Sequence, residues 1–175
     1  MNTSAPYIRL DDLALRNGER WWFTYPLEID PVILGGASYT VLLPEGLTVV
    51  VDRVVGGFLV HVSLAASVHG PCERCLQEAV VQVKTEEEEF VPVAKDGWKE
   101  SEFSEFIQGL VVDVKGLTRE ALVLALPTQI ICSPSCQGLC PSCGQNLNLE
   151  SCDCASATID PRWNKLKDLK LEDDS

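Results

Sequence analysis

Positive charge is scarce in this 175-residue chain. It has 14 lysines and arginines against 26 aspartates and glutamates, so its formal net charge at pH 7 is −12. Such an acidic chain repels phosphate backbones, which argues against nucleic-acid binding through a broad surface and leaves only a local basic contact. The charge balance instead favours a basic partner.

Long apolar runs are also missing. No segment approaches the roughly 18–20 consecutive apolar residues that a membrane-spanning helix needs. Residues 1–20 lack the basic start and apolar core of a secretory signal. We therefore expect a protein of the cytoplasm, or of the plastid stroma if the chain comes from a plant, with no membrane partner. In other respects the composition is that of a globular domain, with 46% apolar and 23% charged residues.

Motifs of the common catalytic sites are the third absence. The sequence has neither a glycine-rich phosphate loop nor a serine–histidine–aspartate arrangement, and its two histidines are His61 and His69. Both fall on the more polar face of one predicted strand, where a surface role is the ordinary one. The acidic run Glu86–Glu89 is interpreted in the same way, as a solvated face. These observations predict no catalytic residues and no small-molecule substrate.

What the first two thirds of the chain contain is typical of an antiparallel sheet. Residues 21–29, 47–55, 58–68 and 79–91 are rich in β-branched and apolar side chains. In residues 58–68, larger apolar side chains alternate with smaller or polar ones, as in a strand with one buried face. Gly56-Gly57 predicts a tight turn before this strand, and Gly70-Pro71 ends it, so a hairpin with residues 79–91 is expected.

Helices are predicted at two places. After an acidic loop over residues 93–105 and a short strand over 111–114, Leu117–Leu126 has helical spacing, and its second half is apolar all round, which predicts burial. Asp160-Pro161 predicts the start of a C-terminal helix. The expected fold class is α+β, mostly antiparallel sheet with a few helices and a zinc-bearing C-terminal lobe. The sheet domain would cover residues 1–127, and the lobe and C-terminal helix residues 128–175.

The eight cysteines carry the main chemical signal. In a chain without a secretory signal, thiols stay reduced, so metal binding is favoured over disulfides. Four thiolates complete a tetrahedral zinc site, and eight cysteines with glycine and proline between them therefore predict two structural zinc ions. Reach along the chain predicts one local site and one long-range site. Their ligands would be Cys140, Cys143, Cys152 and Cys154 in the local site, and Cys72, Cys75, Cys132 and Cys136 in the long-range site.

Other arrangements of the cysteines remain open at this point. The tail could form a single six-cysteine cluster that leaves Cys72 and Cys75 free, and four cysteines also suit an iron–sulfur cluster. Disulfides are a further alternative. A redox-active pair at Cys72 and Cys75 is less favoured, because such a pair normally opens a helix, whereas this one precedes a predicted strand.

Several motifs occur together and in a fixed order. They are the segments Cys72–Leu76, Leu124–Pro127, Gly138–Gly144, Asn146–Asn148, Cys152–Cys154 and Asp160–Trp163. In this combination the chain resembles the large ribosomal RNA subunit accumulation protein family over residues 46–170. The resemblance implies a non-enzymatic ribosome-biogenesis factor, found in bacteria and plastids, that promotes normal accumulation of the large-subunit ribosomal RNA.

The acidic charge then favours a basic ribosomal protein or a large-subunit precursor particle as the partner. Direct RNA contact is expected to be local. One candidate is Arg74, and the other is the aromatic side chain of Trp163 with the basic residues Arg162 and Lys165 beside it. Packing of Trp163 against the lobe is the simpler interpretation of that group. The alternative functional class is a thiol or zinc enzyme, either a CxxC oxidoreductase or an RNA-processing nuclease.

Overall fold

The computed structural model describes residues 7–94 and 104–154. The predicted C-terminal helix, with Arg162, Trp163 and Lys165, lies outside these residues, as does most of the predicted loop over 93–105. The elements, in chain order, are β1 (Tyr7–Arg9), the 3₁₀ helix η1 (Asp11–Leu13), β2 (Arg20–Tyr25), β3 (Val32–Leu34), β4 (Ala37–Leu42), β5 (Leu47–Val54), β6 (Gly57–Pro71), β7 (Glu78–Pro92), β8 (Ile107–Gln108), β9 (Val111–Asp113) and α1 (Val114–Ala125).

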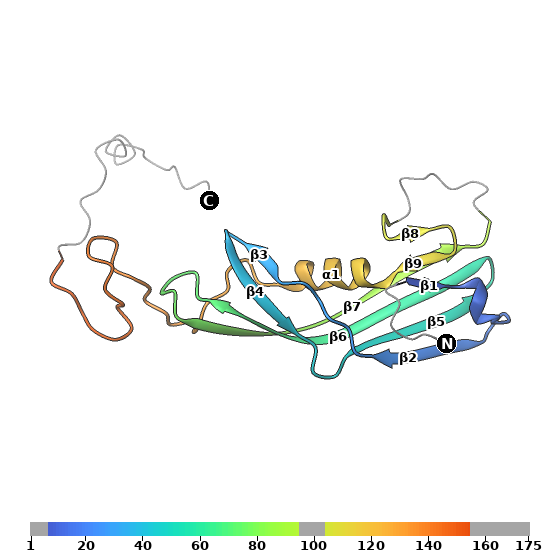
Figure 1. The fold of residues 1–175 in the computed structure, drawn as a ribbon, viewed down its shortest axis with the longest axis horizontal. Helices are drawn as coiled ribbons and strands as arrows, with labels where there is room; N and C mark the ends of the chain where they lie inside the picture. Colours follow the sequence, from blue (N-terminus) through green and yellow to red (C-terminus); the bar gives the residue numbers. More distant parts are fainter. Residues whose placement is uncertain (1–6, 95–103, 155–175) are drawn as a thin grey trace, which may run out of the picture.

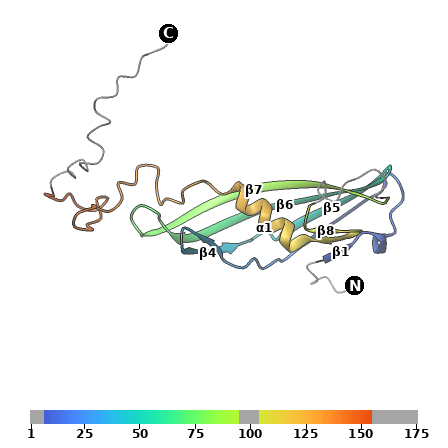
Figure 2. The same cartoon turned by 90° about the horizontal axis from the view of Figure 1, so that it is seen from above.

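The strands form two antiparallel sheets (Figure 1). In the large sheet the order is β2-β5-β6-β4-β3, and β7 pairs with the other edge of β6. The small sheet has the order β1-β9-β8. Both views show α1 and the small sheet over the same face of the large sheet (Figures 1 and 2). The apolar core fills the space between these two layers. This is the mostly antiparallel architecture expected from the sequence, with one α-helix among the described residues.

The central element is the hairpin of β6 and β7. The two strands pair without interruption from Gly57 with Pro92 to Pro71 with Glu78. The alternation predicted for residues 58–68 is confirmed, because the side chains at 58, 60, 62, 64, 66 and 68 are all buried. A hairpin this long carries its tip well beyond the layer covered by α1, as Figure 1 shows.

The turn before β6 differs from the prediction by one residue. Val54 pairs with Gly57, so the two turn residues are Val55 and Gly56, and Gly56 has the positive φ of 89° that favours glycine. Gly57 belongs to the strand instead. A β-carbon there would collide with the Val91 carbonyl and the Phe90 ring, so close approach of the neighbouring strand explains this glycine.

The N-terminal part of the sheet is only partly as predicted. The strand expected over residues 21–29 ends at Tyr25, because Pro26 follows it. Residues 32–42, for which no strand was predicted, form the β3–β4 hairpin, and β4 pairs with the tip half of β6.

Helix α1 begins three residues earlier than the spacing indicated. The side chain of Asp113 caps it by accepting a hydrogen bond of 3.0 Å from the Gly116 amide, directly after β9. The prediction that its second half is buried all round is wrong. Ala121 and Leu122 are buried, but Leu124 is 75% exposed, since the helix lies on a sheet with one side against the core. No helix among the described residues has the length and apolar character needed to cross a membrane.

The tip half of the hairpin is fixed by one aromatic side chain. Tyr39 of β4 is fully buried, and its hydroxyl donates a 3.0 Å hydrogen bond to the carbonyl of Pro71 at the end of β6. Its ring lies against Gly70, where a β-carbon would collide with the ring. The glycine therefore lets the ring of β4 pack directly on the backbone that leads into the cysteine turn.

We predict that Gly70→Ala destabilises the protein by about 1–3 kcal/mol, because the added methyl group forces the buried Tyr39 ring to move. Ser63→Ala, at an exposed position of the same strand, is the control and should change the stability by less than about 0.5 kcal/mol. Urea unfolding followed by circular dichroism measures both. Equal midpoints for the two variants would show that the ring does not need this glycine.

Candidate metal centre

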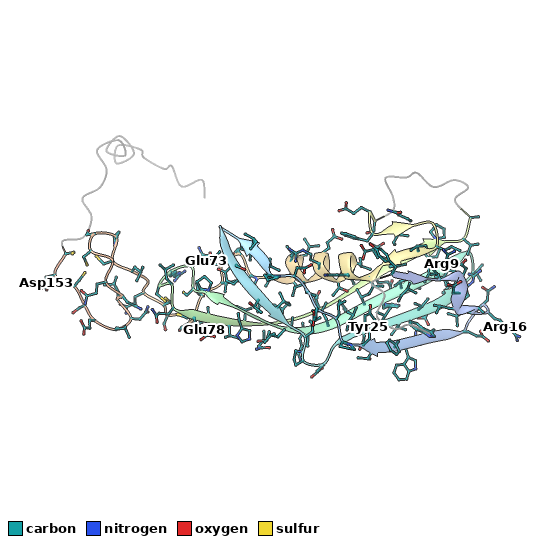
Figure 3. All side chains as sticks on the ribbon, in the orientation of Figure 1. Arg9, Arg16, Tyr25, Glu73, Glu78 and Asp153 are labelled. Atoms are coloured by element: carbon teal, nitrogen blue, oxygen red, sulfur yellow. The ribbon has the colours of Figure 1, made fainter. Side chains whose placement is uncertain are left out.

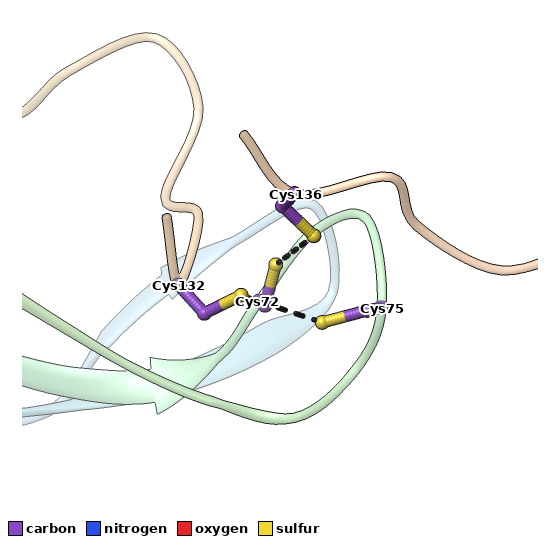
Figure 4. Close-up of side chains that lie close together, drawn as sticks. All are labelled: Cys72, Cys75, Cys132 and Cys136. Atoms are coloured by element: carbon purple, nitrogen blue, oxygen red, sulfur yellow. Dashed lines mark hydrogen bonds between the residues drawn. The ribbon is translucent and has the colours of Figure 1, made fainter. Parts of the chain in front are cut away.

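The first cysteine cluster joins the hairpin tip to the segment after α1. Cys72 and Cys75 lie on the turn between β6 and β7, and Cys132 and Cys136 follow the helix. The Sγ atoms of Cys72 and Cys136 are 3.8 Å apart, and those of Cys75 and Cys132 are 3.5 Å apart (Figure 4). All four sulfurs lie within 4.8 Å of one another, and three of the four residues are buried.

The second cluster is built entirely from the C-terminal lobe. Its four sulfurs also lie within 4.8 Å of one another, but Cys140 is its one buried member. Figure 3 shows this lobe beyond the hairpin tip, with Asp153 far out and Glu73 and Glu78 at the tip itself. The ligands brought together are Cys140, Cys143, Cys152 and Cys154. The structure thus groups the cysteines as the spacing predicted, rather than as one six-cysteine cluster.

The sulfur geometry fits a tetrahedral metal site. A tetrahedron with metal–sulfur bonds of about 2.3 Å has sulfur–sulfur edges of about 3.8 Å. The two separations in the first cluster, 3.8 and 3.5 Å, are close to this value. They are much longer than the roughly 2.05 Å of a disulfide bond. The donor set of four thiols in each cluster is suited to zinc, with iron as the other metal that such sets hold.

The turn that presents Cys72 is held by its own backbone. The amide of Arg74 points at Cys72 Sγ at 3.4 Å, and the amide of Leu76 donates to the Cys72 carbonyl at 2.9 Å. The Cys72 amide in turn donates to Gln77 at 2.7 Å. Closing the turn puts Leu76 at a φ of 61°, a conformation in which non-glycine residues are uncommon.

The second cluster repeats the same turn on Cys140. The amides of Ser142 and Gly144 contact its sulfur and carbonyl at 3.4 and 2.9 Å, and its own amide donates to Gln145 at 2.8 Å. Gly144, with a φ of 75°, stands where the first turn has Leu76. Two segments that share both cysteines and the following glutamine, Gln77 and Gln145, therefore present a cysteine pair in the same backbone geometry.

These turns favour thiolates at their first cysteines. Backbone amides of Cys143 and Ser142 lower the pKa of Cys140 to about 6. Burial opposes ionisation of Cys72, but amides of Cys132, Cys75 and Arg74 outweigh it and bring its pKa to about 6.

In each cluster, neighbouring sulfurs raise the pKa of one of the later cysteines. The sulfurs of Cys75 and Cys136 raise the pKa of Cys132 to about 12, and those of Cys143 and Cys140 raise the pKa of Cys154 to about 12. Four thiolates so close together repel one another unless a cation lies between them. Each cluster could therefore hold a metal cation in place of the thiol protons.

Two side chains for which the sequence predicted no structural role, Glu73 and Arg74, tie the first cluster together. The amide of Ile130 donates to the Glu73 carboxylate at 3.1 Å, and the Glu73 amide donates to the Ile130 carbonyl at 2.9 Å. Arg74, predicted as an RNA contact, donates to the Cys136 carbonyl at 3.3 Å and to Gln129 at 3.3 Å. Glu73 and Arg74 thus fasten the segment after α1 to the hairpin tip, and the RNA contact of Arg74 stays a prediction.

Asn148 links the two clusters. It belongs to the loop of the second cluster, yet its Nδ2 donates to Cys136 Sγ of the first at 3.4 Å. Its Oδ1 accepts a 2.7 Å hydrogen bond from the Gln137 amide. The asparagine pair in the motif Asn146–Asn148 could have pointed to this role, because asparagine side chains often bond to loop backbone and hydrogen-bond partners orient metal ligands.

The histidines take no part in either cluster. His69, three residues before Cys72, has its Nδ1 3.9 Å from Glu78 across the hairpin. His61 lies on the outer face of the sheet, with Nδ1 3.0 Å from Glu88 and Nε2 3.8 Å from Asp52. This agrees with the surface role predicted for both residues.

The fold and the clusters define a class of protein, an antiparallel sheet whose hairpin tip is joined by four thiols to a cysteine-rich lobe. Residues 60–170 match the family model described as the large ribosomal RNA subunit accumulation protein YceD, and the chain belongs to this family.

Relatives with similar sequences occur in mycobacteria. The chain is 34% identical over 122 residues to the uncharacterized protein Rv2926c of Mycobacterium tuberculosis and to the uncharacterized protein Mb2951c of Mycobacterium bovis. The matched part is 68% of this chain and 58% of each relative, so the chain spans less than two thirds of the length of these proteins. No solved structure matches it.

We predict different local effects for one cysteine of each cluster. Cys140→Ser should unfold the C-terminal lobe and leave the β6–β7 hairpin protected, because all ligands of its cluster come from the lobe. Cys75→Ser should loosen the hairpin tip and residues 129–136. Amide hydrogen exchange resolved by residue measures both. The same loss of protection over the whole chain in both variants would contradict two separate sites.

We predict that Asn148→Ala weakens metal retention at the first cluster by about 10- to 100-fold, because a ligand sulfur loses its hydrogen bond. Leu149→Ala, at a 78% exposed position in the same loop, is the control. The rate of zinc transfer to a chromophoric chelator reports the effect. If zinc leaves both variants equally fast, Asn148 does not support the first cluster.

Proposed function

We propose that this protein is a non-enzymatic ribosome-biogenesis factor that promotes accumulation of the large-subunit ribosomal RNA. In this proposal each cysteine cluster holds one zinc ion, and the protein acts through a basic ribosomal protein or a large-subunit precursor particle in the compartment where ribosomes assemble. The observation that carries the proposal is membership of the YceD family together with two closed four-thiol clusters.

The donor sets support a structural role for the metal. Zinc bound by four thiolates supplies folding energy and has no open position for a water molecule or a substrate. The ligands Cys72, Cys75, Cys132 and Cys136 would join the sheet to the lobe, and the remaining four would order the lobe itself. A segment rich in serine, glycine and asparagine has too little apolar surface to order by packing alone.

The environment of Cys72 and Cys75 speaks against a thiol oxidoreductase. The pair lies on a hairpin tip between two strands, whereas redox-active pairs use the start of a helix to activate the first thiol. Both residues are buried, and the sulfur of each lies next to that of a cysteine in the segment after α1. A substrate disulfide would have little access to these thiols.

The charge of the chain favours a protein partner over naked RNA. Two zinc ions bound by four thiolates each would change the net charge from −12 to about −16. Negative charge is concentrated on the hairpin, where β7 has four consecutive glutamates at Glu86–Glu89. Ribosomal proteins are generally basic, so such a surface would attract them and repel phosphates.

We predict that cells in which the encoding gene is deleted accumulate less large-subunit than small-subunit ribosomal RNA, and that wild-type protein restores the ratio. Cys75→Ser should not restore it, because the sheet and lobe are no longer joined. Quantitative RNA gel analysis measures the ratio.

A second result tests the mode of binding. Association of the protein with large-subunit precursor particles should weaken as salt rises, since it depends on opposite charges. An unchanged RNA ratio in the deletion strain would contradict the proposed function, and salt-insensitive association would contradict the charge-based partner.

A further inference from the structure

Helix α1 carries two lengthwise stripes of side chains with opposite surroundings. The first packs into the core and is fully or almost fully buried; it consists of Val114, Leu117, Thr118, Ala121 and Leu122. The second, at the same helical spacing, faces away from the core; it consists of Gly116, Arg119, Glu120, Val123 and Leu124. The outer stripe is apolar at its C-terminal end, where Val123 is 38% and Leu124 75% exposed.

The outer stripe forms one side of a groove. Together with Glu105 and Phe106 it encloses about 370 Å³. The Phe106 ring lies directly over Gly116, where a β-carbon would collide with it, so this wall is fixed against the helix. An apolar side chain placed in the groove would contact Phe106, Val123 and Leu124.

The rim of the groove is acidic. Glu105 and Glu120 line it, and Arg119, the one cation among the described residues that line the groove, donates through its guanidinium to the Asp30 carbonyl at 2.9 Å. Glu89 of the neighbouring strand β7 lies close enough to Glu120 for their carboxyl groups to interact, since burial, Glu87 and Glu120 together raise the pKa of the Glu89 carboxyl group. The last turn of α1 has no basic side chain to balance the negative end of the helix dipole.

We propose that this groove binds a basic amphipathic segment of a large-subunit ribosomal protein. Apolar side chains of that segment would contact Phe106, Val123 and Leu124, and its lysines or arginines would lie beside Glu105 and Glu120. Charge complementarity selects this occupant, since the same rim repels the phosphates of RNA. The inference rests on the proposed function and assigns a surface to it.

Direct binding tests the assignment. Overlapping peptides that cover the large-subunit ribosomal proteins would be titrated with the full-length protein and followed by fluorescence anisotropy. We expect basic amphipathic peptides to bind, and Leu124→Ser to weaken the tightest of them by about tenfold. Because Leu124 is largely exposed, this substitution should leave the fold intact.

Matched variants separate the groove from the rest of the surface. Glu120→Lys should weaken the same peptide and reduce the dependence of its affinity on salt, since an attractive charge becomes repulsive. Val55→Ser removes a largely exposed apolar side chain in the β5–β6 turn, and Glu45→Lys reverses an exposed charge between β4 and β5, which does not line the groove. Both control variants should bind as the wild type does.

Two results would overturn the inference. In the first, the tightest peptides bind equally well to Leu124→Ser and to wild type, or no basic amphipathic peptide binds. In the second, a photo-crosslinker placed at position 124 of the isolated full-length chain reacts with the chain's own residues 155–175, which would make this segment the occupant.

An experiment in cells distinguishes a wrong groove assignment from a wrong proposed function. If the gene deletion lowers large-subunit ribosomal RNA and Leu124→Ser restores it fully, the groove assignment is wrong and the proposed function stands. If the deletion leaves the RNA unchanged, the proposed function itself is wrong.

Discussion

The structure depends on one constraint: two cysteine pairs, 57 to 64 residues apart in the chain, must meet in space. Cys72 and Cys75 reach their partners because β6 and β7 pair along their full length and carry the turn beyond the helix layer. Cys132 and Cys136 reach the same point because α1 crosses the sheet toward the tip (Figure 2). Four thiols then close a loop that spans sheet, helix and lobe, and this closure fixes where the lobe begins.

The second cluster depends on the first for its position. Its loop contacts the hairpin tip through the Leu139 amide, which donates to the Arg74 carbonyl at 3.0 Å, and through Asn148, which donates to Cys136 Sγ. Gly138 permits this approach, since a β-carbon there would lie 3.1 Å from the Arg74 carbonyl. Each cluster thus uses the same cysteine turn, but one joins distant segments and the other orders a local one. Residues 137–148 therefore contact the hairpin tip directly, beside the first cluster.

The sequence predicted the features that repeat with a clear period or spacing. Alternation defined the buried face of β6, and the spacing of the cysteines favoured the two sets that the structure brings together, although it left a six-cysteine cluster open. It could not predict β3 and β4, which are short strands stabilised by pairing with β6 and by the burial of Tyr39. The prediction that the second half of α1 is buried all round was wrong for a similar reason. An apolar stretch has the same sequence pattern whether its outer side faces a core or a surface groove. The roles of Glu73, Arg74 and Asn148 depend on contacts between distant segments, which spacing does not reveal.

The central claim is that the protein is organised by two closed metal sites, and its most direct test is the metal content of single chains. Native mass spectrometry of protein purified anaerobically, without added metal, gives the number and identity of bound ions. The account predicts two zinc ions per chain, one for each group of four cysteines. One zinc ion per chain, or iron with a visible absorption band, would contradict it.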